Sequence, residues 1–347
     1  MKYLEFEIMQ AAGVIVNDLC KVQSGEVVSI TADTVIDESI VNAIAGKVLS
    51  AGGKPLVMWY KTPEGVGKVT DKTVPYKAVG AALGNSDVWI ELGRMWILYS
   101  SAQEIALSMT DKLRHLCLTG LVPEMMDRLF NNVDFELLAE FQRKLTEMTK
   151  NSRHVRMTTS AGTDLEFDND SNCPFYCELG LAHAPGTAYP SGQICWFPTE
   201  GSTNGTLVFD GSIHPVPGIL QTPVSLKIEN GYITEITGGV DAQKFEAWVN
   251  GLNDPLMRRM AHVCYGFHPK AILSGQCVED ERVWGATEWG IGYLPAADCP
   301  PNGINAASHC DGISYNTSVW LDGVQVTDCG KVIHPDLVDM ARRLFPE

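Results

Sequence analysis

The chain has 347 residues, of which 45% are hydrophobic and 20% are charged, and its formal net charge is -16. The composition is that of an ordinary globular protein, and the length predicts two domains. The acidic balance, without a cluster of Lys and Arg, argues against nucleic acids and anionic membrane surfaces as partners.

Two further absences narrow the class of protein. No apolar segment approaches the roughly 18 residues of a membrane-spanning helix, and residues 1–10 carry charges where a secretory signal has its apolar core. We therefore expect a cytoplasmic protein whose ten cysteines are reduced thiols rather than disulfides. The sequence contains no Cys-x-x-Cys, which argues against a structural zinc site or an iron–sulfur cluster.

The first half of the chain alternates between strand and helix patterns. Strands are expected at 25–30, 55–60, 87–92 and 114–118, and helices at 37–49, 75–83 and 102–109. This spacing predicts a Rossmann-like α/β domain with a parallel sheet over residues 1–150, ending in a helix at 135–149. No Gly-x-Gly-x-x-Gly or Gly-x-x-x-x-Gly-Lys follows a strand, which disfavours a dinucleotide or P-loop function.

The second half, residues 151–347, has the pattern of an α+β domain with a mixed or antiparallel sheet. Asn230-Gly231 predicts a tight hairpin turn, because it supplies the positive φ that such a turn needs. A second hairpin is expected at 320–326, and helices at 241–252 and 255–263. Further strands are expected at 154–158, 163–167, 194–197, 206–209, 224–228 and 232–236.

Ser308-His309-Cys310-Asp311 is the strongest indication of chemistry in the sequence. Residues i and i+2 of a strand point to the same face, so His309 and Asp311 can bind one metal ion from one side of a sheet. One imidazole and one carboxylate are two of the three ligands that a non-haem iron site needs. In such a site two imidazoles and one carboxylate leave open coordination positions on the metal.

From Pro190 to the C-terminus the chain resembles the M29 metallo-aminopeptidases of the aminopeptidase T type and their relatives, the 2,5-dihydroxypyridine 5,6-dioxygenases. The first half is similar mainly in its alternating pattern. The resemblance rests jointly on Pro190-Ser191-Gly192, Pro198-Thr199-Glu200-Gly201-Ser202, Asn204-Gly205-Thr206, Glu229-Asn230-Gly231-Tyr232-Ile233, Gly238-Gly239, Arg259-Met260-Ala261-His262, Gly266-Phe267-His268-Pro269 and the His309-x-Asp311 motif.

The two branches imply different metal ligands. The aminopeptidase pattern implies two metal ions on a set rich in glutamate, but this chain has Gln193, His262 and Glu288 where that pattern has Glu, Glu and His. A neutral amide is a poor ligand where two dications need anionic partners. The dioxygenase pattern has a His at position 262, so it implies a mononuclear site of His262, His309 and Asp311.

The same resemblance implies roles for other residues. Tyr99 stands where the dioxygenases keep an acid–base His, and Glu178 matches a carboxylate that contacts substrate or a ligand. Weaker candidates for contact with substrate or with the metal ligands are Glu200, Glu288, His268 and Gln193. Trp196, Trp284 and Trp289 are expected either in the core or as walls of a flat pocket for an aromatic ring.

These residues predict a metal-dependent enzyme, in which an α/β domain accompanies an α+β metal-binding domain. The function implied is an Fe(II) dioxygenase that uses O₂ to open a hydroxylated N-heteroaromatic ring similar to 2,5-dihydroxypyridine. The alternatives are a hydrolase in which Fe, Mn or Zn on the same triad activates water, and a non-catalytic binding module whose site has decayed. A homo-oligomer is expected, since these relatives are commonly oligomeric.

Overall fold

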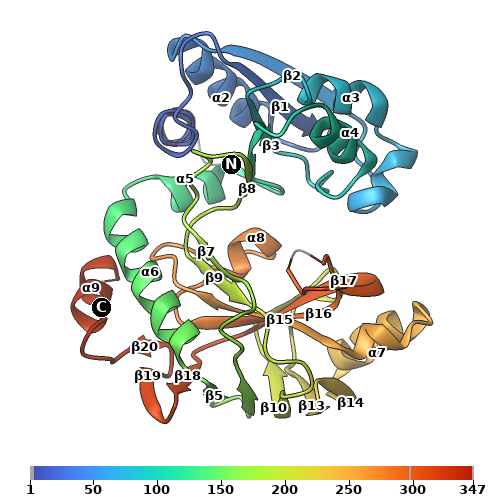
Figure 1. Ribbon diagram of the computed structural model, residues 1–347, viewed down its shortest axis with the longest axis vertical. Helices are drawn as coiled ribbons and strands as arrows, with labels where there is room; N and C mark the ends of the chain where they lie inside the picture. Colours follow the sequence, from blue (N-terminus) through green and yellow to red (C-terminus); the bar gives the residue numbers. More distant parts are fainter. Residues whose placement is uncertain (1–3, 297, 346–347) are drawn as a thin grey trace. The chain divides into compact units, whose positions relative to one another are not determined.

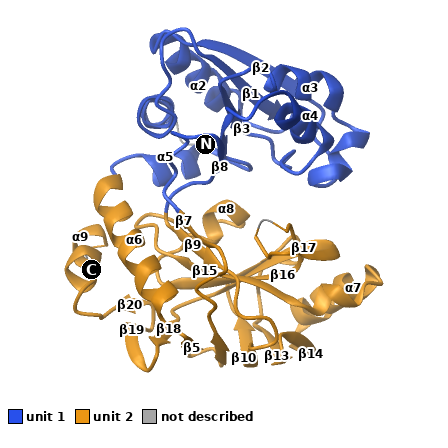
Figure 2. Cartoon of the chain, in the orientation of Figure 1, with its two compact units in different colours: residues 1–133, 178–191 blue, residues 134–177, 192–347 orange. Residues whose placement is uncertain are grey.

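The computed structural model describes residues 4–296 and 298–345, and the chain forms two compact units (Figure 2). Unit 1 comprises residues 1–133 and 178–191, and unit 2 comprises residues 134–177 and 192–347. The predicted boundary at residue 150 differs from this division. Helix α6 (Phe135–Asn151) belongs to unit 2, where its Gln142 side chain donates to the carbonyl of Gln193 and accepts from the Gly192 N–H.

Unit 1 is the predicted α/β unit with a parallel sheet (Figure 1). The strand order is β2–β1–β3–β4–β8, and every pairing is parallel. The unpredicted strand is β8, which is supplied by the segment that returns to unit 1 after residue 177. The bounds are β1 (Val27–Asp33), β2 (Lys54–Tyr60), β3 (Val88–Glu91), β4 (Arg114–Cys117) and β8 (Gly186–Ala188).

The helices of unit 1 begin where the sequence offers caps. Asp37 accepts a hydrogen bond from the Ser39 N–H at the start of α2, and Ser100 accepts one from the Ala102 N–H at the start of α4. The helical segments are α1 (Glu5–Gly13), the π-helix η1 (Val14–Leu19), α2 (Glu38–Ser50), the 3₁₀-helix η2 (Gly67–Lys72), α3 (Tyr76–Leu83), α4 (Ser101–Met109) and α5 (Pro123–Phe130).

Unit 2 contains two large sheets. The eight-stranded sheet has the order β14–β13–β10–β6–β5–β18–β19–β20, and the seven-stranded sheet has the order β12–β11–β17–β16–β15–β9–β7. The first sheet is antiparallel, and so are the pairings from β12 to β9 in the second. This arrangement confirms the predicted α+β class of the second half.

The strands of the eight-stranded sheet are β5 (His154–Thr158), β6 (Asp164–Asp168), β10 (Asn204–Phe209), β13 (Val224–Glu229), β14 (Tyr232–Gly238), β18 (Ser318–Leu321), β19 (Val324–Asp328) and β20 (Lys331–Val332). Those of the seven-stranded sheet are β7 (Phe175–Glu178), β9 (Gln193–Trp196), β11 (Ser212–His214), β12 (Gly218–Ile219), β15 (Met260–Gly266), β16 (Ala286–Leu294) and β17 (Ile304–Ser314). The remaining helical segments of this unit are α7 (Val240–Gly251), η3 (Pro255–Arg258), α8 (Cys277–Asp280) and α9 (Val338–Leu344).

Large aromatic side chains fill the core of unit 2. Phe167 of β6 meets Trp289 of β16 edge to face, with ring centroids 5.3 Å apart. Trp196 and Trp289 are fully buried, so they pack in the core rather than wall a pocket. Trp284, which is half-buried, stacks on Phe141 of α6 with ring centroids 5.6 Å apart. One face of the seven-stranded sheet is thereby used for packing.

The prediction of a helix at 255–263 is wrong. Only Pro255–Arg258 is helical, as a 3₁₀ turn that Asp254 caps by accepting from the Leu256 N–H. Residues from Met260 onward form β15, which pairs with β9 on one side and with β16 on the other. Two flanking strands satisfy the backbone of this segment, and that pairing outweighs the local helical pattern.

No helix among the described residues combines the length and the hydropathy that crossing a bilayer requires. All ten cysteines are free thiols, and eight of them lie in unit 2.

Gly312 provides a test of the packing between the two sheets. A Cβ at this position would lie 2.3–2.5 Å from three ring atoms of Phe209, a core residue with no exposed surface. We expect Gly312→Ala to lower the free energy of unfolding by about 1–3 kcal/mol, because a rigid buried ring has to move. Chemical denaturation followed by tryptophan fluorescence measures this change.

Gly251→Ala is the matched control, since a Cβ at Gly251 meets nothing within 4 Å. Equal stability of the Gly312→Ala and Gly251→Ala variants would contradict the packing described for β10 and β17.

Candidate metal centre

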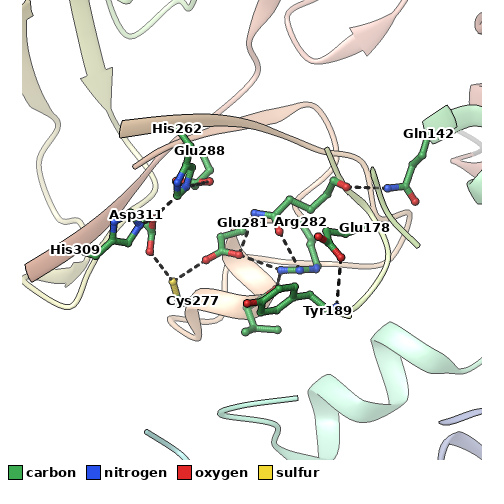
Figure 3. Close-up of polar contacts among 12 residues, drawn as sticks. Gln142, Glu178, Tyr189, His262, Cys277, Glu281, Arg282, Glu288, His309 and Asp311 are labelled. Atoms are coloured by element: carbon green, nitrogen blue, oxygen red, sulfur yellow. Dashed lines mark hydrogen bonds and ion pairs between the residues drawn. The ribbon is translucent and has the colours of Figure 1, made fainter. Parts of the chain in front are cut away.

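The candidate ligands come from two strands of the seven-stranded sheet. His309 and Asp311 lie on β17, and His262 lies on β15. Strand β16 runs between them and pairs Gly292 with His309 and Gly290 with Asp311. The alternation along the three strands directs the ligand side chains to one face of the sheet (Figure 3).

Gly290 makes room for the imidazole of His262. A Cβ built on Gly290 would lie 2.6, 2.7 and 2.8 Å from three atoms of the His262 ring. The ring therefore lies directly over the backbone of β16, and only glycine fits beneath it. The register between β15 and β16 also shifts between Met260 and Val263, an irregularity at the ligand itself.

The three candidate ligand atoms converge. One ligand atom from each of His262, His309 and Asp311 lies within 4.8 Å of the other two. Asp311 Oδ1 is 2.8 Å from His309 Nε2 and 3.5 Å from His262 Nε2. The three side chains are partly or wholly buried, and the two imidazoles and the carboxylate face one another.

The hydrogen bonds of His309 fit a metal ligand. Its Nδ1 is 2.7 Å from the carbonyl oxygen of Tyr293, so Nδ1 carries a proton and donates it. In the neutral ring Nε2 then has a lone pair, which faces the oxygen of Asp311 at 2.8 Å. A proton on Nε2 or a metal cation satisfies both atoms at this distance, and a backbone carbonyl on the second nitrogen is the usual support for a metal-binding imidazole.

Glu288 holds the other imidazole. Its Oε1 and Oε2 atoms are 2.9 and 3.1 Å from His262 Nε2, and its side chain is almost completely buried. Burial raises the pKa of Glu288, although the adjacent His262 opposes the shift. Burial also disfavours the charged form of His262, but the carboxylate of Glu288 outweighs it and raises the pKa of His262 well above its usual range.

The remaining two ligands show the same electrostatic arrangement. Burial opposes the charged form of His309, yet Asp311 raises its pKa. Burial works against the charge of Asp311, and the two histidines nevertheless hold the pKa of Asp311 well below its usual range. The site therefore favours positive charge next to its carboxylates, and a divalent cation supplies that charge while leaving the imidazoles neutral.

A polar network adjoins the triad. Gln193 Nε2 donates to Glu281 Oε2 at 3.1 Å, and Arg282 Nη2 donates to Gln193 Oε1 at 3.0 Å. Cys277 Sγ is 2.9 Å from Glu281 Oε1 and 3.7 Å from Asp311 Oδ2 (Figure 3). The sequence analysis missed Cys277, Glu281 and Arg282, because short helix α8 and the turn after it carry no recognisable motif.

Two of the weaker candidates lie elsewhere in unit 2. Glu200 forms an ion pair with Arg259, whose Nη2 is 2.8 Å from Glu200 Oε1, and it is largely exposed. His268 is completely buried below Gly192, where a Cβ on the glycine would come within 2.5 Å of His268 Cβ. Its Nδ1 accepts from the Lys270 N–H, so its described contacts are those of a loop support.

The two expected acid–base residues lie in unit 1, close to Tyr189. Glu178 Oε2 accepts from the Tyr189 N–H at 3.3 Å. Burial first, and then Tyr99 and other neighbours including Glu178, raise the pKa of Tyr189 well above its usual range. Tyr99 itself has a positive φ of 62° and an exposed fraction of 42%, an uncommon backbone state for a large side chain. The sequence analysis missed Tyr189, although it directly precedes the Pro190-Ser191-Gly192 turn.

The fold and the site together define a protein with an α/β unit and an α+β unit, in which the latter presents a candidate mononuclear metal centre. A family model described as 2,5-dihydroxypyridine 5,6-dioxygenase (NicX) matches residues 14–334. The chain therefore belongs to the 2,5-dihydroxypyridine 5,6-dioxygenase family.

Individual relatives agree with this assignment. A 2,5-dihydroxypyridine 5,6-dioxygenase of Pseudomonas putida KT2440 is 27% identical over 274 residues, which are 75% of this chain and 74% of that protein. The solved structure of the dioxygenase from Pseudomonas putida KT2440 superposes with a TM-score of 0.80 at 22% identity, covering 97% of this chain and 100% of that one. Wild-type AmpT from Thermus thermophilus gives 0.70 at 11% identity, covering 96% and 100%. These two structures show that the fold is shared.

Gly290 offers a direct test of the metal centre. We expect Gly290→Ala to lower the affinity for Fe²⁺ by about 10–100-fold, because the new methyl group displaces the His262 ring without removing a ligand. Anaerobic titration of the metal-free protein, with bound iron counted after gel filtration, measures the effect. Gly251→Ala, where the added Cβ is free of contacts, serves as the control. Unchanged Fe²⁺ affinity in Gly290→Ala would exclude His262 as a ligand.

Proposed function

We propose that this protein is a mononuclear non-haem Fe(II) dioxygenase that cleaves a hydroxylated N-heteroaromatic ring, with 2,5-dihydroxypyridine as the first substrate to test. The observation that carries the proposal is the convergence of His262, His309 and Asp311 within 4.8 Å on one sheet face. Membership of the dioxygenase family supports the reaction class. Mn²⁺ and Zn²⁺ are the alternative metals for the same ligands.

The ligand set fits this chemistry. Three protein ligands leave open coordination positions, which is the arrangement of Fe(II) enzymes that use O₂. Bound there, Fe(II) would supply the redox chemistry that allows O₂ to react with an electron-rich ring. The chain itself supplies the geometry: Tyr293 orients His309, and Gly290 sets the depth of the His262 ring. Glu288 lies beside His262 Nε2 as a further carboxylate at the site.

Proton transfer is the second part of the proposal. Opening a hydroxylated ring requires loss of the ring hydroxyl proton and return of a proton to the product. We assign these steps to Glu178 and Tyr99, which are associated with Tyr189 in unit 1. In this proposal Tyr99 is the proton donor, because a phenol hydroxyl can donate a proton. Glu178 is the corresponding base.

The second candidate function is metal-dependent hydrolysis on the same triad, as a fold shared with AmpT suggests. One observation disfavours the two-metal form of this reaction. Gln193 stands where the aminopeptidase pattern has a glutamate. Its side-chain amide donates a hydrogen bond to Glu281 and accepts one from Arg282. Gln193 is therefore already hydrogen-bonded within the polar network. This supports a site with three ligands for one metal rather than a site for two metals.

We expect the iron-loaded protein to consume O₂ with 2,5-dihydroxypyridine in equal amounts. Asp311→Ala and His309→Ala should lose at least about 1,000-fold of kcat/KM, because each removes a ligand and with it the bound iron. An oxygen electrode with substrate concentrations below KM, together with iron analysis of each variant, measures both quantities. His154→Gln is the control, since His154 is an exposed histidine on β5.

Two outcomes would replace the proposal. Release of amino acids from peptides without O₂ consumption identifies the hydrolase, and an iron-free protein with full activity removes the triad from the reaction. As part of the same proposal we expect a cytoplasmic homo-oligomer, which light scattering of the purified protein and fractionation of the source cells examine.

A further inference from the structure

Unit 1 contains a second group of metal-ligating side chains, at the carboxyl ends of its parallel strands. Glu91 is the last residue of β3, and His115 and Cys117 lie on β4. Glu91 is paired in register with Cys117, and His115 stands two residues before Cys117 on the same face. One ligand atom of each residue lies within 4.8 Å of the other two.

Two atoms of this group are buried without hydrogen bonds. Glu91 Oε2 and His115 Nε2 are 3.1 Å apart, yet neither has a hydrogen-bond partner of acceptable geometry within the described part of the chain. The exposed fractions of the three residues are 0% for Glu91, 2% for His115 and 3% for Cys117. A buried polar atom without a partner is costly, so this pair of atoms requires an explanation.

The negative charge of Glu91 is also without a compensating lysine or arginine among the residues that the structure describes. No lysine or arginine of residues 4–296 and 298–345 forms an ion pair with it, and His115 is its one ionic neighbour there. A carboxylate without exposed surface needs a compensating positive charge. Cys117 does not supply one: burial, and then the charge of Glu91, raise the pKa of its thiol.

Neighbouring residues orient the side chains of this cluster, as residues around a metal site orient its ligands. Trp89 stacks on the His115 ring, with centroids 3.7 Å apart and planes 7° apart. His115 Nδ1 is 3.1 Å from Thr187 Oγ1 of β8, which can accept a hydrogen bond from the Nδ1–H group, and in that tautomer Nε2 has a lone pair. Glu91 Oε1 accepts from the Ile97 N–H, so its other oxygen is the one directed to the cluster.

We propose that Glu91, His115 and Cys117 bind a zinc-class divalent cation in unit 1, separate from the iron site of unit 2. One imidazole, one thiolate and one carboxylate are ligands that Zn²⁺ prefers, and a water completes the tetrahedron. Binding releases the thiol proton of Cys117 to solvent, with no change in oxidation state. The sequence analysis argued against a structural zinc site because the chain has no Cys-x-x-Cys motif. That argument does not apply to this cluster, whose ligands come from two adjacent strands.

The position of the cation suggests what it does. Through Glu91 it fixes the Ile97 backbone, and Ile97 is two residues from Tyr99. Through His115 it joins β4 to β8, since Thr187 is the partner of His115 in register. The cation is thus a structural one that ties the ends of three strands and the segment before α4.

The experiment must separate this cluster from two thiol-bearing groups of unit 2. Cys195, His262 and Cys264 form one of them, and Cys277, Glu281 and Asp311 form the other. Full-length Asp311→Ala protein removes the iron triad and the second of these groups at once. This variant is stripped of metal, reloaded with Zn²⁺ or Co²⁺, and freed of excess ion by gel filtration.

We expect the Asp311→Ala protein to retain about one Zn²⁺ per chain, and its zinc X-ray absorption spectrum to show a single sulfur ligand. The Co²⁺ form should show a thiolate-to-cobalt charge-transfer band. Adding Cys117→Ala should abolish the band, whereas adding Cys20→Ala, a buried free thiol of the same unit, should leave it unchanged.

Each other result overturns the proposal. Two sulfur ligands, or a band that disappears with Cys264→Ala but persists with Cys117→Ala, places the ion on the Cys195 and Cys264 pair of unit 2. No retained Zn²⁺ in a folded Asp311→Ala protein shows that the cluster is a metal-free polar network. The sulfur count needs no change in unit 1, so poor folding of Cys117→Ala does not prevent a decision. Because iron is absent from every sample, failure of the dioxygenase assay leaves this result unaffected.

Discussion

The convergence of the candidate ligands in unit 2 depends on β16, the strand that lies between them and leaves room for their side chains. β16 separates the two ligand-bearing strands and carries glycine opposite both His309 and Asp311. Any side chain at Gly290 would occupy the volume of the His262 ring. Because Gly290 and Gly292 have no side chains, the imidazoles of the strands on either side can approach each other over the backbone of β16. They come close enough to share one ion.

The opposite faces of the same strands have a contrasting task. Trp289, between Glu288 and Gly290, is completely buried and packs edge to face on Phe167. Strand alternation thus places a polar side chain of the candidate site and a core side chain at successive residues. A shift of β16 by one residue would exchange the two faces, so the packing of Trp289 also fixes the register of the metal centre.

The sequence was informative where periodicity and local motifs coincide with the final contacts. The alternation of unit 1 predicted four of its parallel strands, because short right-handed connections leave few other arrangements. The i, i+2 spacing of His309 and Asp311 predicted a shared sheet face, because side chains two residues apart on a strand point to the same side. Asn230-Gly231 predicted a turn between β13 and β14 from the conformation that these residues favour.

The remaining features depend on contacts between distant segments, which no local pattern records. His262 was assigned to a helix because its strand is specified by β9 and β16 rather than by its own residues. Gln193, Glu281 and Arg282 meet through hydrogen bonds between positions about ninety residues apart in the chain. Glu91, His115 and Cys117 meet only because β3 and β4 are neighbours in register.

The path of the chain through the two units limits how unit 1 can form during synthesis. Its sheet is completed by β8, which is translated after the whole of α6 and the first strands of unit 2. Until residue 188 has left the ribosome, β4 has an open edge and His115 lacks its contact with Thr187. The sheet of the amino-terminal segment therefore stays incomplete while later residues emerge, and a fragment that ends before β8 lacks the strand that pairs with β4.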